Sequence, residues 1–407
     1  MKILHIHSLF HPNMVGGAER ILQALAEAQL SIGHLPVVLS LSPQAGVRIG
    51  EVNGVKVYYV HLKNIYWPFG HPEVPVIAKP LWHAIDAYNP FMAPVIGHIL
   101  DAEAIDVVHT HNLTGFSVSV WRQVKQRGLP LVHTLRDYSL LCPKTTMFYN
   151  GQNCVSQHWL CRFYSHYRIT LSQTVDSVCA VSQFTLNRHL QAGAFTKVPD
   201  KRVIHNFRSF NQGSVCRNRM KLEDSPLVLG FIGQLTPAKG IELLLDVVSR
   251  MTSTGWELRV AGKGRRAYEE LLSARYTRDN VRFLGFTEST AFYSQIDVLV
   301  VPSLWHEPFP GVIIEAYSYA IPVIAAARGG IPEIVDDMVT GLLFDPDRPE
   351  TLRASVQAFL DDRSLASTLG GNAYRKAQAF PAESICQEYD AVYSRIVRSG
   401  QRGANNT

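Results

Sequence analysis

Apolar and polar positions along the chain follow two periods, one typical of buried strands and one typical of helices. The opening run MKILHIH is followed by a Gly-Gly turn and by the segment AERILQALAEAQLSIGH. Its apolar residues recur at helical spacing, as Ile21, Leu25, Ala28 and Ile32 show. Gly33 gives that helix a stop signal. Short β-rich runs such as PVVLSLS, IDVVHTHN and LPLVHTL continue the pattern, which predicts parallel strands joined by helices.

A second series of the same kind begins after a polar, basic connector that follows Asn206. Its runs include LVLGFIGQL, WELRVAGKG, IDVLVVPS and IPVIAAA, with helical spacing in GIELLLDVVSRM. The sequence therefore predicts an α/β fold with two doubly wound domains, residues 1–206 and 207–380. A C-terminal helix over 381–400 and a disordered tail over 401–407 complete the predicted organisation. Ligands of such sheets bind outside the carboxyl ends of the strands, so two facing domains would enclose a cleft.

Composition places the chain among ordinary globular proteins. It has 407 residues, of which 46% are hydrophobic and 18% charged, and no apolar run approaches the roughly 18 residues of a membrane span. The N-terminus reads as a strand and lacks the regions of a signal peptide, and six cysteines are too few for a disulfide framework. We therefore expect a cytoplasmic protein.

Positive charge is concentrated in the first half of the chain. Residues 1–205 carry 17 Lys and Arg against 11 Asp and Glu, whereas residues 206–407 carry 22 against 23. This asymmetry fits contact with an anionic membrane face or an anionic acceptor, and a mildly basic solvated surface explains it equally well. No basic cluster is dense enough to predict nucleic-acid binding. Residues 64–94, rich in proline and aromatic side chains, predict an irregular or helical insertion with exposed apolar groups.

The stretch WHEPFPGVIIEA carries the most informative chemistry. It predicts a loop followed by a helix that starts near Pro310, with Glu307 before the helix and Glu315 about one turn inside it. The free N–H groups at the helix start would bind an anion, and a carboxylate on each side would accept paired hydroxyls of a sugar and a ribose. Taken alone, two glutamates in this pattern are more often a residue that caps or salt-bridges a surface helix and a solvated loop residue.

Two glycine-containing turns add phosphate-friendly geometry. Lys239 and Gly240 lie at the mouth of a helix after the first strand of the second domain, where an ammonium could neutralise a diphosphate. Gly16 and Gly17 occupy the equivalent turn of the first domain, where a bare backbone can approach a ligand closely. Each turn by itself is also what a tight strand-to-helix connection requires.

Motifs in the same order along residues 1–345 resemble a known family. They are GGAER, HTHN, HTLRDYSLLCPK, AVSQFT, IHNF, GQLTPAKG, RFLGFT and PSLWHEPFPGVIIEA, followed by IPVIAAARGGIPEIV and TGLLF. The set resembles the retaining, nucleotide-sugar-dependent glycosyltransferases of family four, the group 1 type. The resemblance implies the GT-B fold, in which two Rossmann-like domains face each other. It further implies an acceptor-binding first domain, a donor-binding second domain, and a C-terminal helix that crosses back to the first.

The resemblance also assigns roles to individual residues. Glu315 would hold the ribose, Glu307 a hydroxyl of the donor sugar, and Lys239 the diphosphate. The positions that match catalytic residues are His111, with His109 as the weaker choice, Glu307 and Lys239. The positions that match donor-binding residues are Gly16, Gly17, Gln234, Lys239, Phe309, Pro310, Gly311, Val312 and Glu315. No metal and no cofactor is expected, and the donor would be a UDP- or GDP-linked sugar.

Three positions depart from the family pattern. Gln234 stands where arginine is common, and an amide does not replace a positive charge beside a diphosphate. Arg136 stands where histidine commonly precedes the Asp-Tyr pair, which would bring a charge into the cleft. Ala320 replaces the glycine that commonly precedes the Pro-Val strand. Gln234 motivates the alternative of a non-catalytic carbohydrate-binding or nucleotide-binding protein of the same fold.

Histidine and cysteine spacings leave metal-binding alternatives open. The pairs His5 and His7, and His109 and His111, each place two imidazoles on one face of a strand end, which would suit a metal-dependent hydrolase. No further pattern in the sequence completes such a site. Three cysteines could join a histidine around zinc, although their spacing fits no standard pattern; they are Cys142, Cys154 and Cys161, with His158.

The expected reaction transfers a sugar to an acceptor hydroxyl with retention at the anomeric carbon. Double displacement would need a nucleophile beneath that carbon, and the sequence assigns none. The family-implied route is front-face substitution, in which the leaving phosphate helps to remove the acceptor proton. The acceptor is expected to be a saccharide or a lipid-linked saccharide, used in cell-surface polysaccharide or glycolipid assembly, with the protein resting peripherally on the inner membrane face.

Overall fold

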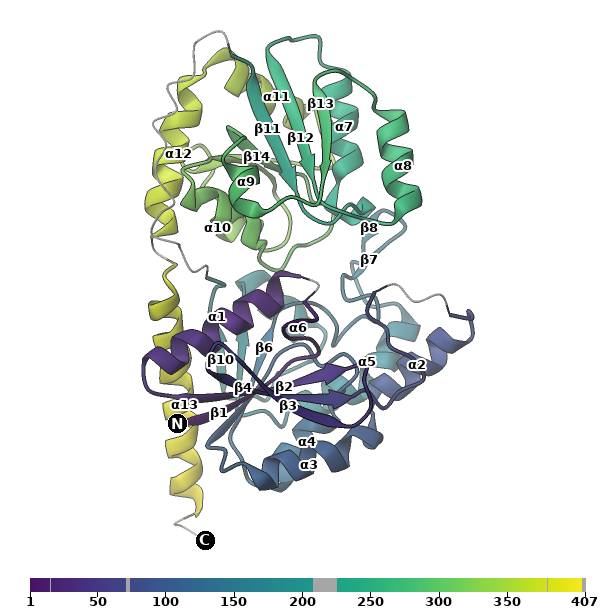
Figure 1. Ribbon diagram of the computed structural model, residues 1–407, viewed down its shortest axis with the longest axis vertical. Helices are drawn as coiled ribbons and strands as arrows, with labels where there is room; N and C mark the ends of the chain where they lie inside the picture. Colours follow the sequence, from purple (N-terminus) through teal and green to yellow (C-terminus); the bar gives the residue numbers. More distant parts are fainter. Residues whose placement is uncertain (15, 71–73, 208–224, 379, 405–407) are drawn as a thin grey trace. The chain divides into compact units, whose positions relative to one another are not determined.

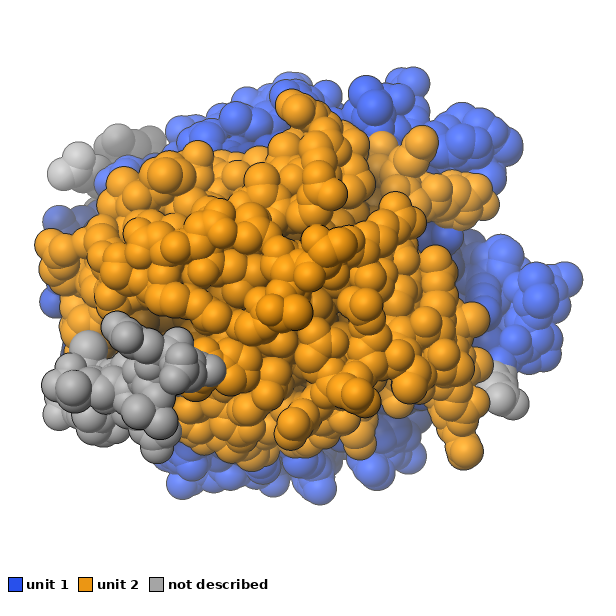
Figure 2. Space-filling model, turned by 90° about the horizontal axis from the view of Figure 1, so that it is seen from above, with its two compact units in different colours: residues 1–147, 154–206, 382–407 blue, residues 148–153, 207–381 orange. Residues whose placement is uncertain are grey.

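The computed structural model describes residues 1–14, 16–70, 74–207, 225–378 and 380–404. The chain divides into two compact units, which Figure 2 colours separately. Unit 1 comprises Met1–Met147, Cys154–Asn206 and Ala382–Thr407, and unit 2 comprises Phe148–Asn153 and Phe207–Pro381. The predicted connector lies almost wholly at 208–224, outside the described residues. Residues 148–153 belong to unit 2, whereas the predicted boundary at 206 places them in the first domain.

Unit 1 is built on an eight-stranded sheet in the order β10-β9-β6-β5-β1-β2-β4-β3. All neighbouring strands pair in parallel except β3 and β4, which form an antiparallel edge. The central strands are almost wholly buried, as expected where helices cover both faces, although each of them carries a buried histidine. The strands are β1 (Lys2–Ile6), β2 (Leu35–Ser42), β3 (Val47–Val52), β4 (Val55–His61), β5 (Val107–Thr110), β6 (Leu131–Leu135), β9 (Ser177–Ala180) and β10 (Asp200–Val203).

Helices flank this sheet, and the last of them comes from the C-terminus of the chain (Figure 1). That helix packs against α1, so the far end of the chain belongs to the core of unit 1. It reaches Ala404, which corrects the predicted tail: residues 401–404 are helical. The helices are α1 (Gly17–Ser31), α2 (Ala78–Ala87), η1 (Pro90–Met92), α3 (Ala93–Ala102), α4 (Ser119–Gln126), α5 (Trp159–Ser172), α6 (Gln183–Gln191) and α13 (Ala382–Ala404).

The proline-rich segment 64–94 is partly core and partly surface. Trp82 is buried and donates its indole N–H to the carbonyl of Tyr66 at 2.9 Å. Leu81, on the same helix α2, is 54% exposed. The prediction of a helical insertion with exposed apolar groups is therefore confirmed, and the opposite face of α2 is buried because a helix in contact with a core buries one stripe.

Unit 2 is built on a six-stranded parallel sheet in the order β13-β12-β11-β14-β15-β16. Its strands are β11 (Leu227–Ile232), β12 (Trp256–Ala261), β13 (Val281–Gly285), β14 (Val298–Val301), β15 (Val323–Ala326) and β16 (Gly341–Phe344). Its helices are η2 (Pro237–Lys239), α7 (Ile241–Ser249), α8 (Arg266–Arg275), α9 (Ser289–Tyr293), α10 (Gly311–Ser318), η3 (Ile331–Glu333), α11 (Pro349–Asp361) and α12 (Ser364–Ala377). A short hairpin, β7 (Phe148–Tyr149) and β8 (Gln152–Asn153), also belongs to unit 2.

Each sheet reverses its strand order once, and the reversal marks where a ligand edge is expected. In unit 1, β1 lies between β2 and β5; in unit 2, β11 lies between β12 and β14. Loops that leave neighbouring strands at such a point diverge to opposite faces and open a crevice at the carboxyl ends. The loops that follow these strands contain His7 and His111 in unit 1, and Lys239 and Glu307 in unit 2.

Candidate functional site

A buried carboxylate is held between a lysine and a serine at the ligand edge of unit 2. Nζ of Lys239 donates to Oε1 of Glu307 at 2.5 Å, and the hydroxyl of Ser303 donates to the same oxygen at 2.8 Å. The Glu307 side chain is only 5% exposed and that of Lys239 is 30% exposed. The Lys239 ammonium also lies 5.5 Å from the centre of the Trp305 ring. The structure thus brings two of the predicted site residues into one ion pair.

Two glycines allow the backbones around this pair to approach each other. Gly240 has φ 71°, and a Cβ there would meet the carbonyl oxygen of Pro302 at 1.8 Å. Gly329 has φ 59°, and a Cβ there would meet the carbonyl oxygen of Glu307 at 2.3 Å. A side chain fits at neither position, so glycine is required for the loops after β11, β14 and β15 to meet.

Helix α10 follows the Glu307 loop and presents its N-terminus beyond Pro310. The helix begins at Gly311, so Pro310 is the residue before the first helical position and not that position itself. A Cβ at Gly311 would meet no atom within 4 Å, so packing within the chain does not demand a glycine there. Glu315 is the fifth helical residue, as predicted, and is 9% exposed. Of the apolar side chains between the glutamates, Phe309, Ile313 and Ile314 are buried and Val312 is half-buried.

Asn153 is a residue near the candidate site that the sequence did not reveal. Its side-chain amide donates to the carbonyl of Leu304 at 2.7 Å and accepts from the backbone N–H of His306 at 3.0 Å. It thereby clamps the two residues that flank Trp305, immediately before Glu307. The sequence alone could not reveal this contact, because about 150 residues separate Asn153 from Leu304.

Ala320 and Gln234, two of the departures from the family pattern, take different places in unit 2. Ala320 follows α10 with φ 54°, a left-handed conformation in which glycine is unstrained. Gln234 lies exposed in the loop after β11. The alanine therefore costs backbone strain, while the glutamine places an uncharged side chain at the ligand edge.

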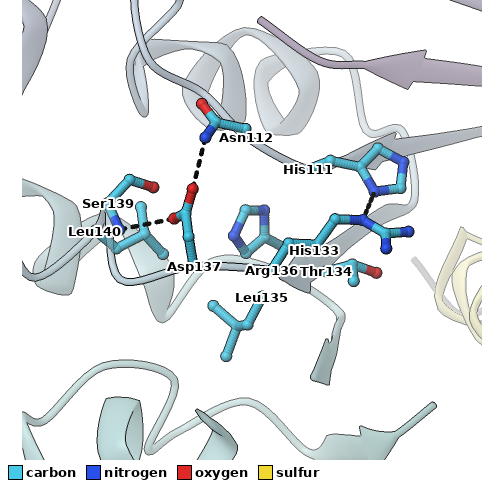
Figure 3. A pocket seen from close by; sticks show the side chains of 9 residues that line it. All are labelled: His111, Asn112, His133, Thr134, Leu135, Arg136, Asp137, Ser139 and Leu140. Carbon is cyan, nitrogen blue, oxygen red and sulfur yellow. Dashed lines mark hydrogen bonds between the residues drawn. The ribbon is translucent and has the colours of Figure 1, made fainter. Parts of the chain in front are cut away.

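The ligand edge of unit 1 holds a small pocket beside His111 (Figure 3). Nε–H of Arg136 donates to Nδ1 of His111 at 3.4 Å, and its other nitrogen Nη1 donates to Oδ1 of Asn206 at 2.6 Å. Asp137 accepts from the side chain of Asn112 at 2.6 Å and from the backbone N–H of Ser139 at 2.7 Å. A histidine, an arginine and an oriented carboxylate therefore line one pocket. The lining residues are His111, Asn112, His133, Thr134, Leu135, Arg136, Asp137, Ser139 and Leu140.

The histidines behind this pocket are uncharged. Burial lowers the pKa of His5 from 6.5 to about 4, and burial, together with the neighbouring histidines and Arg136, lowers the pKa of His109 and of His111 well below 6.5. Burial and His189 lower the pKa of His133 to about 3. Neutral imidazoles each offer one donor and one acceptor, so these rings serve as hydrogen-bonding groups at neutral pH.

The ring nitrogens of His5, His109 and His111 lie within 4.8 Å of one another, close enough to surround a metal ion. Their lone pairs are already engaged, however. Nδ1 of His5 bonds Nε2 of His111 at 3.1 Å, and Nδ1 of His109 bonds the hydroxyl of Tyr393 at 2.7 Å. A metal would have to break these bonds, so the donor set favours a hydrogen-bonded cluster over the metal-dependent hydrolase.

The predicted cysteine cluster is not arranged as a metal site either. Among the described residues, no three of Cys142, Cys154, Cys161 and His158 bring their ligand atoms as close together as a metal ion requires. Nδ1 of His158 accepts the backbone N–H of Leu160 at the start of α5 and so acts as a helix cap.

His7, considered in sequence only as a metal ligand, has an unpaired donor. Its Nδ1 accepts the backbone N–H of Leu9 at 3.2 Å, so Nε2 carries the proton, and this buried N–H has no partner among the described residues. Gly16 and Gly17 lie at the start of α1, where the Gly16 N–H donates to Glu19 at 2.8 Å. A Cβ at Gly17 would meet no atom within 4 Å. Chain packing does not explain this glycine, as it does not explain Gly311.

Two family models match the chain in the same order as its two units. The model described as "Glycosyl transferase 4-like domain" matches residues 16–206, and the model described as "Glycosyl transferases group 1" matches residues 216–376. A Klebsiella pneumoniae protein, described as an uncharacterized 42.6 kDa protein in a cps region, is 31% identical over 334 residues. That match covers 82% of this chain and 87% of the relative. The chain belongs to the group 1 glycosyltransferases of the family-four type.

Solved structures show the fold of this class. The sucrose-phosphate synthase of Thermosynechococcus elongatus superposes with a TM-score of 0.77 at 21% identity, covering 98% of this chain and 99% of that one. An Anabaena protein solved in complex with UDP-glucose superposes with a TM-score of 0.71 at 22% identity, covering 97% and 100%. The fold is therefore GT-B, and the chain is a glycosyltransferase. Among the described residues, every helix is too short or too polar to cross a bilayer.

Proposed function

We propose that the protein is a retaining glycosyltransferase that moves a hexose from a UDP- or GDP-linked donor to an acceptor hydroxyl. The observation that carries this proposal is the Lys239–Glu307 pair beside the N-terminus of α10 in unit 2. An ammonium, a buried carboxylate and free helical N–H groups together suit a sugar joined to a diphosphate. The Anabaena neighbour, solved with UDP-glucose, supports a uridine donor.

In the proposed donor complex each part of the nucleotide sugar has its own partner in unit 2. The ribose would bind Glu315, the diphosphate Lys239, and a sugar hydroxyl Glu307. The remaining backbone contacts would come from the loop and first turn of α10, namely Phe309, Pro310, Gly311 and Val312, with Gln234 at the loop after β11. Ligand binding would then have to share the Lys239 ammonium between Glu307 and phosphate, which an uncharged Gln234 does not assist.

The proposed chemistry is front-face substitution without a metal. The C–O bond between the sugar and the diphosphate breaks, the acceptor oxygen bonds the anomeric carbon from the same face, and the acceptor proton passes to the leaving phosphate. Lys239 and the amides at the α10 N-terminus would stabilise the developing negative charge. His111, held neutral, would lie near the anomeric carbon as a hydrogen-bonding group without adding positive charge to an oxocarbenium-like state. Gly16 and Gly17 would let the backbone of unit 1 approach the ligand.

A thermal-shift panel followed by transfer assays tests this function. Stabilisation by one nucleoside diphosphate over the others identifies the base, since a ligand that binds only the folded state raises the unfolding temperature. The same diphosphate linked to different hexoses then identifies the sugar, and the anomeric configuration of the product, read by NMR, decides between retention and inversion. Turnover undiminished by EDTA supports metal independence. Saturable binding with no turnover across donors and acceptors would instead support the non-catalytic carbohydrate-binding alternative.

We also propose that the acceptor is a lipid-linked saccharide and that unit 1 meets the inner membrane face through the α2–α5 surface. That surface is defined by the exposed apolar residues of these two packed helices and the turn before α2, namely Val76, Ile77, Leu81, Trp159, Leu160, Phe163 and Tyr167. Phe163 is 83% exposed and Trp159 is 68% exposed. Monomeric proteins rarely expose apolar groups so densely without a partner.

The charges on the α2–α5 surface fit an anionic bilayer. Lys79 and Arg162 are exposed on these helices, and α5 contains no Asp or Glu. The single acid of α2, Asp86, is buried against the guanidinium of Arg168 at 2.6 Å. Aromatic and aliphatic groups beside cations are the combination that binds an anionic headgroup layer.

Vesicle flotation tests the membrane proposal. We expect the protein to float with vesicles that contain anionic lipid and to stay in solution with zwitterionic vesicles. Phe163→Glu should abolish flotation, whereas Leu271→Glu, which places the same change on an exposed leucine of α8 in unit 2, should preserve it. Equal flotation by both variants, or none by the unaltered protein, would overturn the proposal while leaving glycosyl transfer to soluble acceptors untouched.

A further inference from the structure

A continuous chain of hydrogen bonds runs behind the pocket of unit 1. It starts at Arg136, which contacts Nδ1 of His111 at 3.4 Å, and Nε2 of His111 contacts Nδ1 of His5 at 3.1 Å. Nε2 of His5 contacts Oε1 of Gln29 at 2.7 Å. The side chains of the first half therefore come from the loop after β6, the end of β5, strand β1 and helix α1.

The second half of the chain reaches the C-terminal helix. Nε2 of Gln29 contacts the hydroxyl of Tyr393 at 3.3 Å, and that hydroxyl contacts Nδ1 of His109 at 2.7 Å. Nε2 of His109 contacts the hydroxyl of Thr134 at 2.7 Å, which lies 3.4 Å from the hydroxyl of Tyr389. Residues from α13 thus close the same network that begins at the pocket.

The donor at Arg136 and the acceptor at Gln29 favour the same direction for the hydrogen bonds between them, whereas the contact between Thr134 and Tyr389 can run either way. A guanidinium can only donate, so Nδ1 of His111 accepts for as long as it keeps the contact with Arg136, and its Nε2 then carries the proton. His111 then donates to Nδ1 of His5, whose Nε2–H donates to the carbonyl oxygen of Gln29. The Gln29 amide donates to Tyr393, the tyrosine hydroxyl donates to His109, and Nε2–H of His109 donates to Thr134. One direction satisfies all of the contacts, and reversing it would set two N–H groups against each other between Arg136 and His111.

The structure assigns Gln29 to a positioning role: we infer that it fixes the tautomer of His111 through His5, so that the lone pair of His111 Nδ1 faces Arg136 at the pocket. Gln29 lies wholly buried on α1 and is remote from the pocket lining. Without its carbonyl oxygen, His5 has no acceptor for Nε2–H and can move that proton to Nδ1. His111 must then accept at Nε2 and carry its proton on Nδ1, and the contact with Arg136 is lost. At 3.4 Å that contact is long, so losing it costs less than leaving the buried N–H of His5 without an acceptor.

The inference rests on the proposed role of His111 for its effect on turnover, and on geometry alone for the tautomer. Gln29→Met removes the acceptor while keeping the length of the side chain. Gln23→Met is the control, because Gln23 lies on the same helix and bonds Glu27 at 2.8 Å, away from the histidines. Long-range proton–nitrogen spectra of protein labelled with ¹⁵N-histidine distinguish the protonated ring nitrogen, and a His111→Gln variant assigns the signal.

We expect His5, His109 and His111 of the unaltered protein to carry their protons on Nε2 at neutral pH. In Gln29→Met the His111 signal should show protonation at Nδ1, and kcat should fall on the order of tenfold with the donor KM within about twofold, since a wrong tautomer impairs catalysis more than binding. Gln23→Met should change neither quantity. Thermal unfolding of both variants identifies any loss of folded protein.

Three results would overturn the inference. The first is a proton on Nδ1 of His111 in the unaltered protein, and the second is an unchanged His111 tautomer in folded Gln29→Met. The third is binding of one equivalent of Zn²⁺ by the unaltered protein that His5→Gln abolishes, which would make the three histidines a metal site. If instead no donor is turned over, the proposed function fails while the spectra still decide the tautomer.

Discussion

The expected ligand edges of the two units differ in the charge of the groups that they present. Unit 2 presents an ion pair between the ammonium of Lys239 and the carboxylate of Glu307. The loops around this pair approach each other so closely that they require glycine. Unit 1 presents neutral, buried imidazoles linked by hydrogen bonds, with Arg136 at the outer end. Histidines are divided between the two halves of the chain in the same way, since His306 is the only histidine after residue 205.

Burial explains why the two edges differ. A partly exposed ammonium remains accessible to a ligand, which suits binding a diphosphate. Fully buried imidazoles lose their charge and retain one donor and one acceptor each, which suits orienting groups precisely where added charge would be unfavourable. The unit proposed to bind the donor therefore presents an ion pair, and the unit proposed to bind the acceptor presents a network of directional hydrogen bonds behind its pocket.

The largest expected effect separates two glycines that look alike in sequence. Gly240→Ala should destabilise unit 2 by roughly 3 kcal/mol or more, because a Cβ would lie 1.8 Å from the Pro302 carbonyl oxygen at a positive φ. Gly17→Ala should change stability by less than about 0.5 kcal/mol, because its Cβ meets no atom within 4 Å. Calorimetry measures both. A large loss of stability in Gly17→Ala would contradict the assignment of that glycine to ligand approach.

Acid should weaken unit 1 before unit 2. The folded-state pKa of His5 is about 4, below the 6.5 of the unfolded chain, so the unfolded state binds more protons between those values. Stability is therefore complete above about pH 6.5 and falls as the pH drops toward 4, by roughly 3 kcal/mol for this one group. Hydrogen exchange followed by mass spectrometry should show β1 and β5 losing protection ahead of β11 and β14. Simultaneous loss of protection in both sheets would show that the two units do not differ in their stability to acid.

Removing the cation of unit 2 should cost both stability and ligand binding. Lys239→Met leaves the Glu307 carboxylate, 5% exposed, without its counter-charge, which we expect to cost about 2 kcal/mol and to weaken nucleoside diphosphate binding about 100-fold. Lys376→Met is the matched control, since Lys376 pairs with Asp336, whose side chain is 54% exposed. That variant should lose less than about 1 kcal/mol and bind normally. Isothermal titration and thermal unfolding measure the two effects.

The clamp on the Glu307 loop should have a smaller effect. Asn153→Ala removes two hydrogen bonds to the backbone of Leu304 and His306, at an expected cost of about 1–2 kcal/mol. Because the loop that leads to Glu307 loses its anchor, the donor KM should rise while kcat changes little. A fall in kcat with an unchanged donor KM would show that Asn153 acts elsewhere.

The smallest expected effect is a gain in stability. Ala320 has φ 54°, so Ala320→Gly should relieve left-handed strain and raise the stability of unit 2 by about 1 kcal/mol. Thermal unfolding measures the change, with activity expected to stay constant. A loss of stability would mean that the alanine methyl group contributes packing that exceeds the strain.

The sequence by itself determined the class of fold and the order of the site motifs. Apolar runs at strand and helix periods predicted two parallel sheets, and both exist. The placement of Glu315 one turn into a helix was also predictable, because helix geometry relates residues that are close in sequence. The predicted start of that helix was one residue too early, since proline fits both at the cap and at the first helical position.

Tertiary structure alone decided which side chains meet. Gln29, His109 and Tyr393 belong to three distant segments, and only the packing of α13 on α1 and the sheet joins them into one network. The same holds for the contact of Asn153 with Leu304. Local periodicity records which residues can share a face, whereas the partners of a buried polar group depend on how distant elements pack, and that contact leaves no pattern in a single sequence.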